Sequence, residues 1–231
     1  MKYPITCLIL MLLNACAVPA QADLILTLNS GSSTVVVIDE SPSSTLSSGG
    51  SYTSTVNDSI AGSGIVGFTG AVGSFVVNVT TGISRPLIGP YAIDLNNVSV
   101  SGGAGTLTIG LIDTGFLIPS AGNYSVVSEF GGTTDGFITS VTGGILDSNA
   151  ETGFGADTLQ GPFGPGSFSG TRTGSVSLSN TFSMNTVVSF THGAAGQITS
   201  FDHKFSVAVP EPATGGFLLA ITCLIGLRRR R

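Results

Sequence analysis

The amino-acid sequence predicts an all-β protein whose central part, residues 23–209, is a single β-sandwich of the jelly-roll or immunoglobulin-like kind. Glycine, serine and threonine dominate this part, whereas the strong helix formers Lys, Glu, Gln, Arg and Met are scarce. Apolar stretches rich in Val, Ile, Leu and Phe recur between clusters of Gly, Ser and Asn, as expected where short strands turn back repeatedly. No fixed sequence period is present, which disfavours a repeat solenoid.

Strands follow from the side-chain pattern along this central part. Leu107, Ile109 and Leu111 alternate with Thr and Gly, so this segment predicts a strand with one buried face. The glycine- and proline-rich residues 143–171 predict a long irregular loop, and residues 41–51 a second one. The predicted strands cover residues 24–29, 33–39, 64–69, 73–80, 91–100, 105–112, 123–130, 136–141, 174–179, 182–191 and 197–208.

The first 22 residues have the organisation of a secretory signal peptide, which adds a signal helix before the sandwich. Lys2 precedes an apolar stretch at residues 5–13, and small residues end in Ala20 and Ala22. Cleavage after Ala22 would make residue 23 the first of the exported domain. A lipoprotein alternative stays open, because Leu13-Asn14-Ala15-Cys16 resembles a bacterial lipobox in which Cys16 carries the lipid.

The last 22 residues, 210–231, combine a rigid breaker, an apolar run and a cation cluster. The apolar run, residues 213–227, is about 22 Å long as a helix against a hydrocarbon core of about 30 Å. The arginines after it favour the cytoplasmic side for this end, which leaves residues 23–209 outside. We therefore predict a short membrane helix. The breaker is Pro210, Glu211 and Pro212, and the anchor residues are Phe217, Leu218, Leu219, Ile221, Leu224, Ile225, Leu227, Arg228, Arg229, Arg230 and Arg231.

This tail closely resembles the PEP-CTERM sorting signal of exported bacterial proteins. The resemblance rests on the Pro-Glu-Pro motif, its distance from the C-terminus, and the apolar and basic segments that follow. It implies recognition by exosortase, a membrane protease or transpeptidase of Gram-negative bacteria that make extracellular polysaccharide. It further implies transient docking in the inner membrane, removal of the tail, and delivery to the cell surface or matrix. The resemblance implies no activity for the exported domain.

The cysteine content of the exported domain excludes disulfides, and its charge limits the classes of partner that it can bind. All three cysteines of the chain lie in the two terminal segments, so residues 23–209 form no disulfide. Three basic residues against twelve acidic ones give this domain a net charge of −9. Such a surface repels phosphate backbones and excludes nucleic acid. Divalent cations and neutral glycans remain as candidate partners.

We expect no cofactor, with calcium as the one candidate ion. Asp147, Asn149 and Glu151 place oxygen ligands two residues apart in a glycine-rich segment, and Asp157 follows. The segment is not an EF-hand, because threonines stand where that loop needs its glycine and its closing glutamate. A solvated acidic loop is the simpler alternative.

Other candidate sites favour structural interpretations. Residues 62–67 fit G-x-G-x-x-G, but a turn and a strand are expected after them rather than a helix. His192 and His203 are expected on the surface, without a catalytic role. Asp113 is expected in a turn after its strand.

These observations predict a non-catalytic surface or matrix protein that associates with exopolysaccharide. A carbohydrate-binding module is an alternative, although the exported domain has no Trp and only Tyr52, Tyr91 and Tyr124 to stack on sugars. A secreted hydrolase is a more remote alternative, because it would need acids such as Asp147, Glu151 and Asp157 to converge on a cleft.

Overall fold

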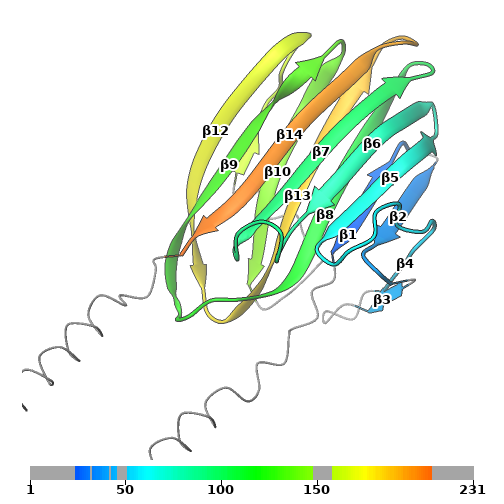
Figure 1. Cartoon of the computed structure of the whole chain (residues 1–231). Coiled ribbons are helices and arrows are strands. Elements are labelled where there is room, and N and C mark those ends of the chain that lie inside the picture. The colour runs from blue at the N-terminus through cyan, green and yellow to red at the C-terminus, as the bar shows by residue number, and fades with distance from the viewer. Residues whose placement is uncertain (1–23, 32, 42, 46–50, 148–157, 210–231) are drawn as a thin grey trace, which may run out of the picture.

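The described part of the chain is a sandwich of two six-stranded antiparallel sheets (Figure 1). The computed structural model describes residues 24–209 except residues 32, 42, 46–50 and 148–157. The first sheet, here the back sheet, contains in spatial order β11 (Thr158–Gln160), β10 (Phe137–Asp147), β13 (Thr181–His192), β8 (Gly105–Leu117), β1 (Ile25–Asn29) and β2 (Thr34–Ile38). The second, the front sheet, contains β12 (Gly166–Leu178), β9 (Gly122–Thr134), β14 (Ile198–Ala208), β7 (Ala92–Ser101), β6 (Phe75–Ile83) and β5 (Ile65–Val72). A separate hairpin pairs β3 (Ser43–Thr45) with β4 (Ser51–Thr53).

The predicted β-sandwich is confirmed, and each predicted strand corresponds to an observed one. Two loop predictions are wrong in part. Within residues 143–171, β10 continues to Asp147, β11 pairs with it, and β12 begins at Gly166. Within residues 41–51, the short strands β3 and β4 pair with each other. Both segments are poor in large apolar residues, so hydrophobic alternation could not mark strands that pair mainly through their backbones.

The core lies between the two sheets and is built by alternating side chains. In β14, Phe201, Phe205 and Val207 point inward and are buried, while the residues between them face out. Aromatic rings fill the centre: Phe130 lies 5.0 Å from Phe168 and 5.7 Å from Phe201, measured between ring centroids. The sandwich therefore has one large apolar core between the two sheets, and Ile25 and Ile38 form a small separate cluster with Val36.

The two ends of the described chain emerge on the same side of the sandwich. The start of β1 and the end of β14 both lie at the lower end in Figure 1, at separate points. The predicted signal and membrane helices lie outside the described residues. Within residues 24–209, as far as they are described, no helix is long and apolar enough to cross a membrane.

Candidate functional site

Most of the site residues predicted from the sequence lie outside the described residues. This holds for the cleavage residues Ala20 and Ala22, for the sorting motif at residues 210–212, and for the anchor residues after it. Of the calcium candidates, Asp147 is the last residue of β10, whereas Asn149, Glu151 and Asp157 are not described. The calcium site stays a prediction. Among the described side chains, no group of three or more His, Cys, Asp or Glu could hold a metal ion.

The surface placement predicted for the two histidines is wrong, because both are fully buried between the sheets. His203 Nε2 lies 2.8 Å from Ser128 Oγ, and its Nδ1 is hydrogen-bonded to Thr186 Oγ1. Gln160 Nε2 donates to Ser128 Oγ at 2.9 Å, which extends the network. Burial lowers the pKa of His203 to about 3, so the ring is neutral.

His192 is the second buried histidine, and it too belongs to the core. Its Nε2 lies 2.7 Å from Thr199 Oγ1, which is 2.7 Å from Thr134 Oγ1. Burial lowers its pKa, while the charge of Asp135 opposes the shift. Strand alternation brings both histidines inward, where hydroxyl groups contact both ring nitrogens of His203 and Nε2 of His192. They form part of the packing and do not line an open site.

The turn predicted at Asp113 is also wrong, because β8 continues through it to Leu117. The Asp113 carboxylate is fully buried and accepts a hydrogen bond from Ser84 Oγ. Arg85 Nε lies 3.5 Å from Asp113 Oδ2, and the Arg85 guanidinium sits 4.0 Å from the centroid of the Phe116 ring. Burial raises the pKa of Asp113, and the nearby Arg85 charge opposes that shift. The ion pair connects the segment after β6 to β8.

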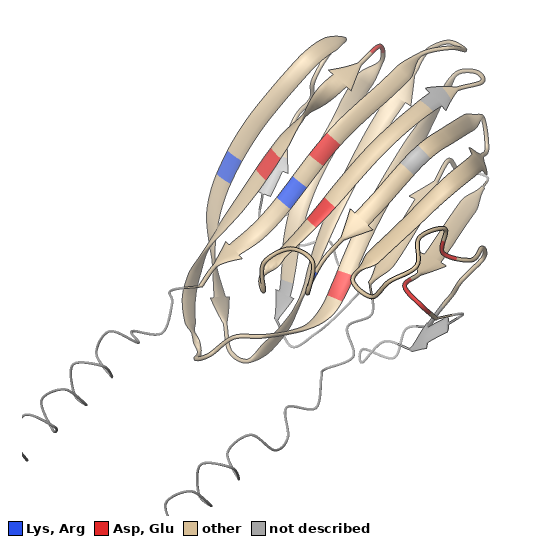
Figure 2. Ribbon diagram, viewed as in Figure 1, with Lys and Arg blue, Asp and Glu red and all other residues tan. Residues whose placement is uncertain are grey.

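The most developed surface site is a polar groove on the outer face of the front sheet. Figure 2 shows charged residues gathered on the central strands of this sheet. The groove has a volume of about 840 Å³, within the usual range for ligand sites. We call it the outer groove. It is lined by Asn96, Glu129, Phe130, Gly131, Gly132, Ser169, Gly170, Thr171, Ser200, Phe201, Asp202 and Lys204.

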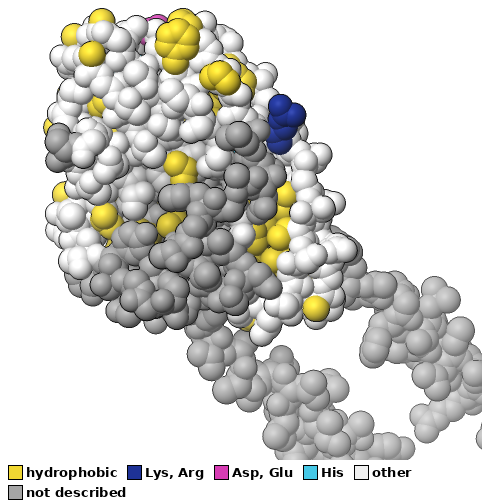
Figure 3. Space-filling view, turned by 180° about the vertical axis from the view of Figure 1, so that it is seen from behind, with side chains coloured by type: hydrophobic (Ala, Val, Ile, Leu, Met, Phe, Trp, Pro, Cys, Tyr) yellow, Lys and Arg dark blue, Asp and Glu magenta, His cyan; other side chains and the backbone are white. Residues whose placement is uncertain are grey.

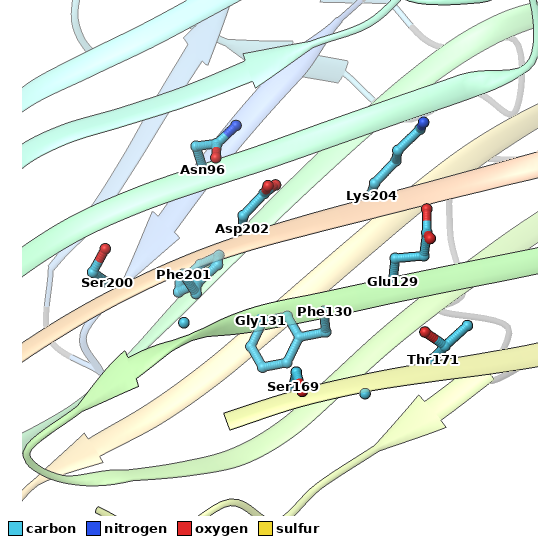
Figure 4. A pocket seen from close by; sticks show the side chains of 12 residues that line it. Asn96, Glu129, Phe130, Gly131, Ser169, Thr171, Ser200, Phe201, Asp202 and Lys204 are labelled. Carbon is cyan, nitrogen blue, oxygen red and sulfur yellow. The ribbon is translucent and has the colours of Figure 1, made fainter. Parts of the chain in front are cut away.

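Cross-strand register arranges these side chains in two rows. Asn96 on β7 pairs with Asp202 on β14, which pairs with Gly131 on β9. Two residues further along β14, Lys204 lies opposite Glu129. Figure 4 shows these side chains on the face of the sheet, with Gly131 on β9, the strand between β14 and β12. The rows mix amide, carboxylate, ammonium and hydroxyl groups, so hydrogen-bond donors and acceptors alternate across the groove.

Glycine at position 131 opens the floor of the outer groove. Its neighbours Glu129 and Thr133 on β9 are exposed, as expected for outward-facing positions. A Cβ built on Gly131 would meet its nearest atoms, Phe168 O and Ser169 Cβ, at 3.7 and 3.9 Å, which is ordinary contact. A side chain here would therefore fit the backbone and project into the groove.

A carboxyl pair lies at one side of the outer groove. Asp94 precedes Asn96 by two residues on β7, so both face outward, and Asp94 is opposite Lys204 in register. Burial, followed by the hydrogen bond and charge of Asp202, raises the pKa of Asp94 to about 7. The Lys204 charge opposes this shift. Asp94 is therefore partly protonated near neutral pH.

Two further grooves adjoin the outer groove. A groove of about 260 Å³ lies over the edge of β12 and shares Ser169, Gly170 and Thr171 with the outer groove. It adds Gln160, Phe163 and Arg172. A more apolar groove of about 680 Å³ lies near the end where the chain termini emerge, lined by Pro90, Tyr91, Pro119, Val207 and Val209 among others.

The back sheet presents a different surface. Hydroxyl pairs cross its outer face, with Thr106 Oγ1 2.8 Å from Thr191 Oγ1 and Thr108 Oγ1 3.0 Å from Ser189 Oγ. In the view from behind, the visible charged side chains lie at the margins and hydrophobic side chains are scattered (Figure 3). The outer groove and the charged side chains around it therefore lie on the same face, the outer face of the front sheet.

Comparisons with known proteins leave the family open. No protein-family model matches the chain, and no curated protein matches it. One similar solved structure is TmCBM61 in complex with β-1,4-galactotriose, with a TM-score of 0.28 and 13% identity over 64% of this chain and 89% of that chain. Another is Arthrobacter globiformis T6 isomalto-dextranase complexed with panose, with a TM-score of 0.22 and 15% identity over 62% of this chain. This chain spans 23% of that enzyme. Likenesses at these scores carry no conclusion about function.

Sequence reasoning did not find the outer groove. Its residues come from β7, β9, β12 and β14, which are widely separated along the chain. The one available signal was alternation: Asp202 and Lys204 flank an inward His203, and Glu129 lies two residues before Gly131. Strand order was needed to place these positions side by side.

Proposed function

We propose that this chain is an exported, non-catalytic cell-surface or matrix protein whose C-terminal tail is sorted and processed by exosortase. The observation that carries the proposal is the order of Pro-Glu-Pro, apolar run and four arginines at residues 210–231. The emergence of both chain ends from one side of the sandwich is compatible with it. A tail docked in the inner membrane would leave the faces of both sheets accessible on the outer side. Processing would then release the sandwich to the surface or matrix.

We further propose that the sandwich associates with extracellular polysaccharide. Support comes from the outer groove, whose amide, carboxylate, ammonium and hydroxyl groups can donate to and accept from sugar hydroxyls. The net charge of −9 on residues 23–209 disfavours polyanionic partners. In this proposal the protein binds polysaccharide as a matrix component and does not cleave it.

A carbohydrate-binding module is the second candidate, favoured by the same groove. The two tyrosine side chains that the structure describes in this domain, Tyr91 and Tyr124, do not supply a stacking platform for it. Tyr124 is buried, and Tyr91 is half-buried with its ring 6.3 Å from that of Phe182. Tyr52 lies in β4, outside both large sheets. A module of this kind would therefore depend on hydrogen bonds rather than on ring stacking.

The sorting proposal is tested by fractionating cells that express the epitope-tagged chain with and without residues 210–231. We expect the full chain to reach the surface or medium without its tail, and the truncated form to stay in the periplasm. A matched pair of variants sharpens the test: Pro210→Ala with Pro212→Ala should block processing, whereas Pro90→Ala with Pro119→Ala in the sandwich should not. Normal surface delivery of the truncated form would overturn the assignment.

A further inference from the structure

The outer groove combines features that suit one class of ligand. Its polar groups come in complementary neighbours, with Asn96 beside Asp202 and Lys204 beside Glu129. A sugar hydroxyl both donates and accepts a hydrogen bond, so adjacent donor and acceptor groups can satisfy it fully. Ser169, Thr171 and Ser200 add hydroxyls of the same dual character. Phe130 and Phe201 at its floor are each only 3% exposed, so neither presents an aromatic face to a ligand. Polar groups therefore supply the directional contacts of the groove.

The charged residues of the outer groove indicate which hydrophilic polymers it can bind. Asp94, Glu129 and Asp202 lie on or beside it together with Lys204, and Arg172 lies in the smaller groove that continues it. The excess of carboxylates opposes a polyanion such as a uronic-acid polymer. Lys204 stands between Asp94 and Glu129 in the cross-strand row, which opposes a dense array of ligand cations at that point. A neutral polysaccharide is repelled neither by the carboxylates nor by Lys204.

The dimensions indicate an extended ligand. Strands β7, β14, β9 and β12 are consecutive neighbours, so the groove spans three strand spacings, about 14 Å. The smaller groove over the edge of β12 continues it through Ser169, Gly170 and Thr171 toward Gln160 and Arg172. A polymer segment can therefore cross the strands and leave over the sheet edge, where a single sugar would fill only part of the space.

We infer that the outer groove binds a segment of a neutral, hydroxyl-rich polysaccharide, laid across β7, β14, β9 and β12 over Gly131. This inference deepens the proposed polysaccharide association and rests on it. It assigns the contact to one face of the molecule and to one glycan class. It also gives Gly131 a role: its missing side chain opens the floor of the binding path.

Gly131 allows a direct steric test. Gly132 and Gly170 would be poor positions for this purpose, because a Cβ on Gly132 would collide with the backbone of β14 and one on Gly170 with Gln160. Gly131→Leu fits the backbone and fills the groove. The matched control is Gly103→Leu, on the loop between β7 and β8, where an added Cβ meets nothing within 4 Å. Asp202→Asn is a second test that changes hydrogen bonding without adding bulk.

The experiment is affinity electrophoresis of the full chain in detergent through gels that contain one polymer each. The probes are dextran, galactomannan and hydroxyethylcellulose as neutral polymers, alginate as a polyanion and chitosan as a polycation. We expect retardation by at least one neutral polymer and not by alginate or chitosan. Gly131→Leu should weaken that binding at least tenfold, Asp202→Asn by roughly tenfold, and Gly103→Leu should leave it unchanged. Circular dichroism spectra of all variants should match the unaltered chain.

The failures are distinguishable. If no polymer retards the unaltered chain, the proposed polysaccharide association fails. If a neutral polymer binds but Gly131→Leu and Asp202→Asn bind it equally well, the association stands and the outer groove is not the site. Retardation by alginate or chitosan alone overturns the assigned glycan class. Loss of binding in Gly103→Leu as well would overturn the steric argument.

Discussion

Acid should destabilise this sandwich more than it destabilises a variant without the His203 imidazole. The ring is fully buried between the sheets, with hydroxyl groups at both nitrogens. Burial lowers its pKa from 6.5 to about 3. The unfolded chain therefore binds a proton below about pH 6.5 that the folded chain binds only near pH 3. The free energy of unfolding falls as the pH falls through that window.

The magnitude follows from the width of the window. One pKa unit corresponds to about 1.4 kcal/mol, so about two units of acidification below 6.5 cost about 3 kcal/mol. Carboxylates complicate the raw pH profile. Burial raises the pKa of Asp39 to about 6, so its ionisation costs stability at neutral pH and acid restores it. Only a difference between variants isolates the histidine contribution.

The assay is urea unfolding followed by far-ultraviolet circular dichroism at about pH 7.5 and about pH 4.5. The unaltered chain should lose about 3 kcal/mol more between these pH values than His203→Gln does. Thr186→Val is the matched control: it removes one partner of the ring but keeps the imidazole, so stability should drop at both pH values while the pH dependence remains. Equal pH dependence in the unaltered chain and His203→Gln would refute the reasoning.

Three further predictions concern the core and the outer groove. Arg85→Met should destabilise the fold by about 3–5 kcal/mol in urea unfolding, because it leaves the buried Asp113 carboxylate without its cation. Arg85→Lys keeps a cation, so a loss of stability no larger in Arg85→Met than in Arg85→Lys would argue against this. Phe130→Ala should cost about 3–5 kcal/mol, because the ring packs at the centre of the aromatic core; a loss below about 1 kcal/mol would contradict that position. Asp94→Asn should raise stability by about 1–2 kcal/mol at pH 8, with allowance for solvent screening. Burial and then the neighbouring Asp202 raise the pKa of Asp94 to about 7, so its ionisation costs stability in the folded chain. This gain should shrink at pH 5, and an equal gain at both pH values would be inconsistent with the titration.

The strands could be predicted because they depend on local chemistry. In β8, Leu107, Ile109 and Leu111 are each fully buried, as their alternation with Thr and Gly predicted. The strands missed were β3, β4 and β11, three residues each. In β3 and β4, Ser, Thr and Tyr give no apolar alternation, and pairing with a neighbouring strand decides their conformation.

The placement of polar residues could not be predicted in the same way. His192 and His203 look like surface residues because each stands beside polar or small neighbours, yet strand alternation turns them inward. Asp113 resembles a turn residue before Thr and Gly, but β8 continues past it because Ser84 and Arg85 reach it from another strand's end. Partners at distant positions made burial of these groups tolerable.

The sequence by itself determined the β class, the longer strand segments and the charge of the exported domain, because backbone propensity, alternation and composition are properties of neighbouring residues. It also carries the tail motif on which the sorting proposal rests. The tertiary structure decided the outer groove, since Asn96, Gly131, Ser169 and Asp202 become neighbours only once β7, β9, β12 and β14 pair in one sheet. Strand order is a long-range choice, made by the packing of the whole core, and no local pattern encodes it.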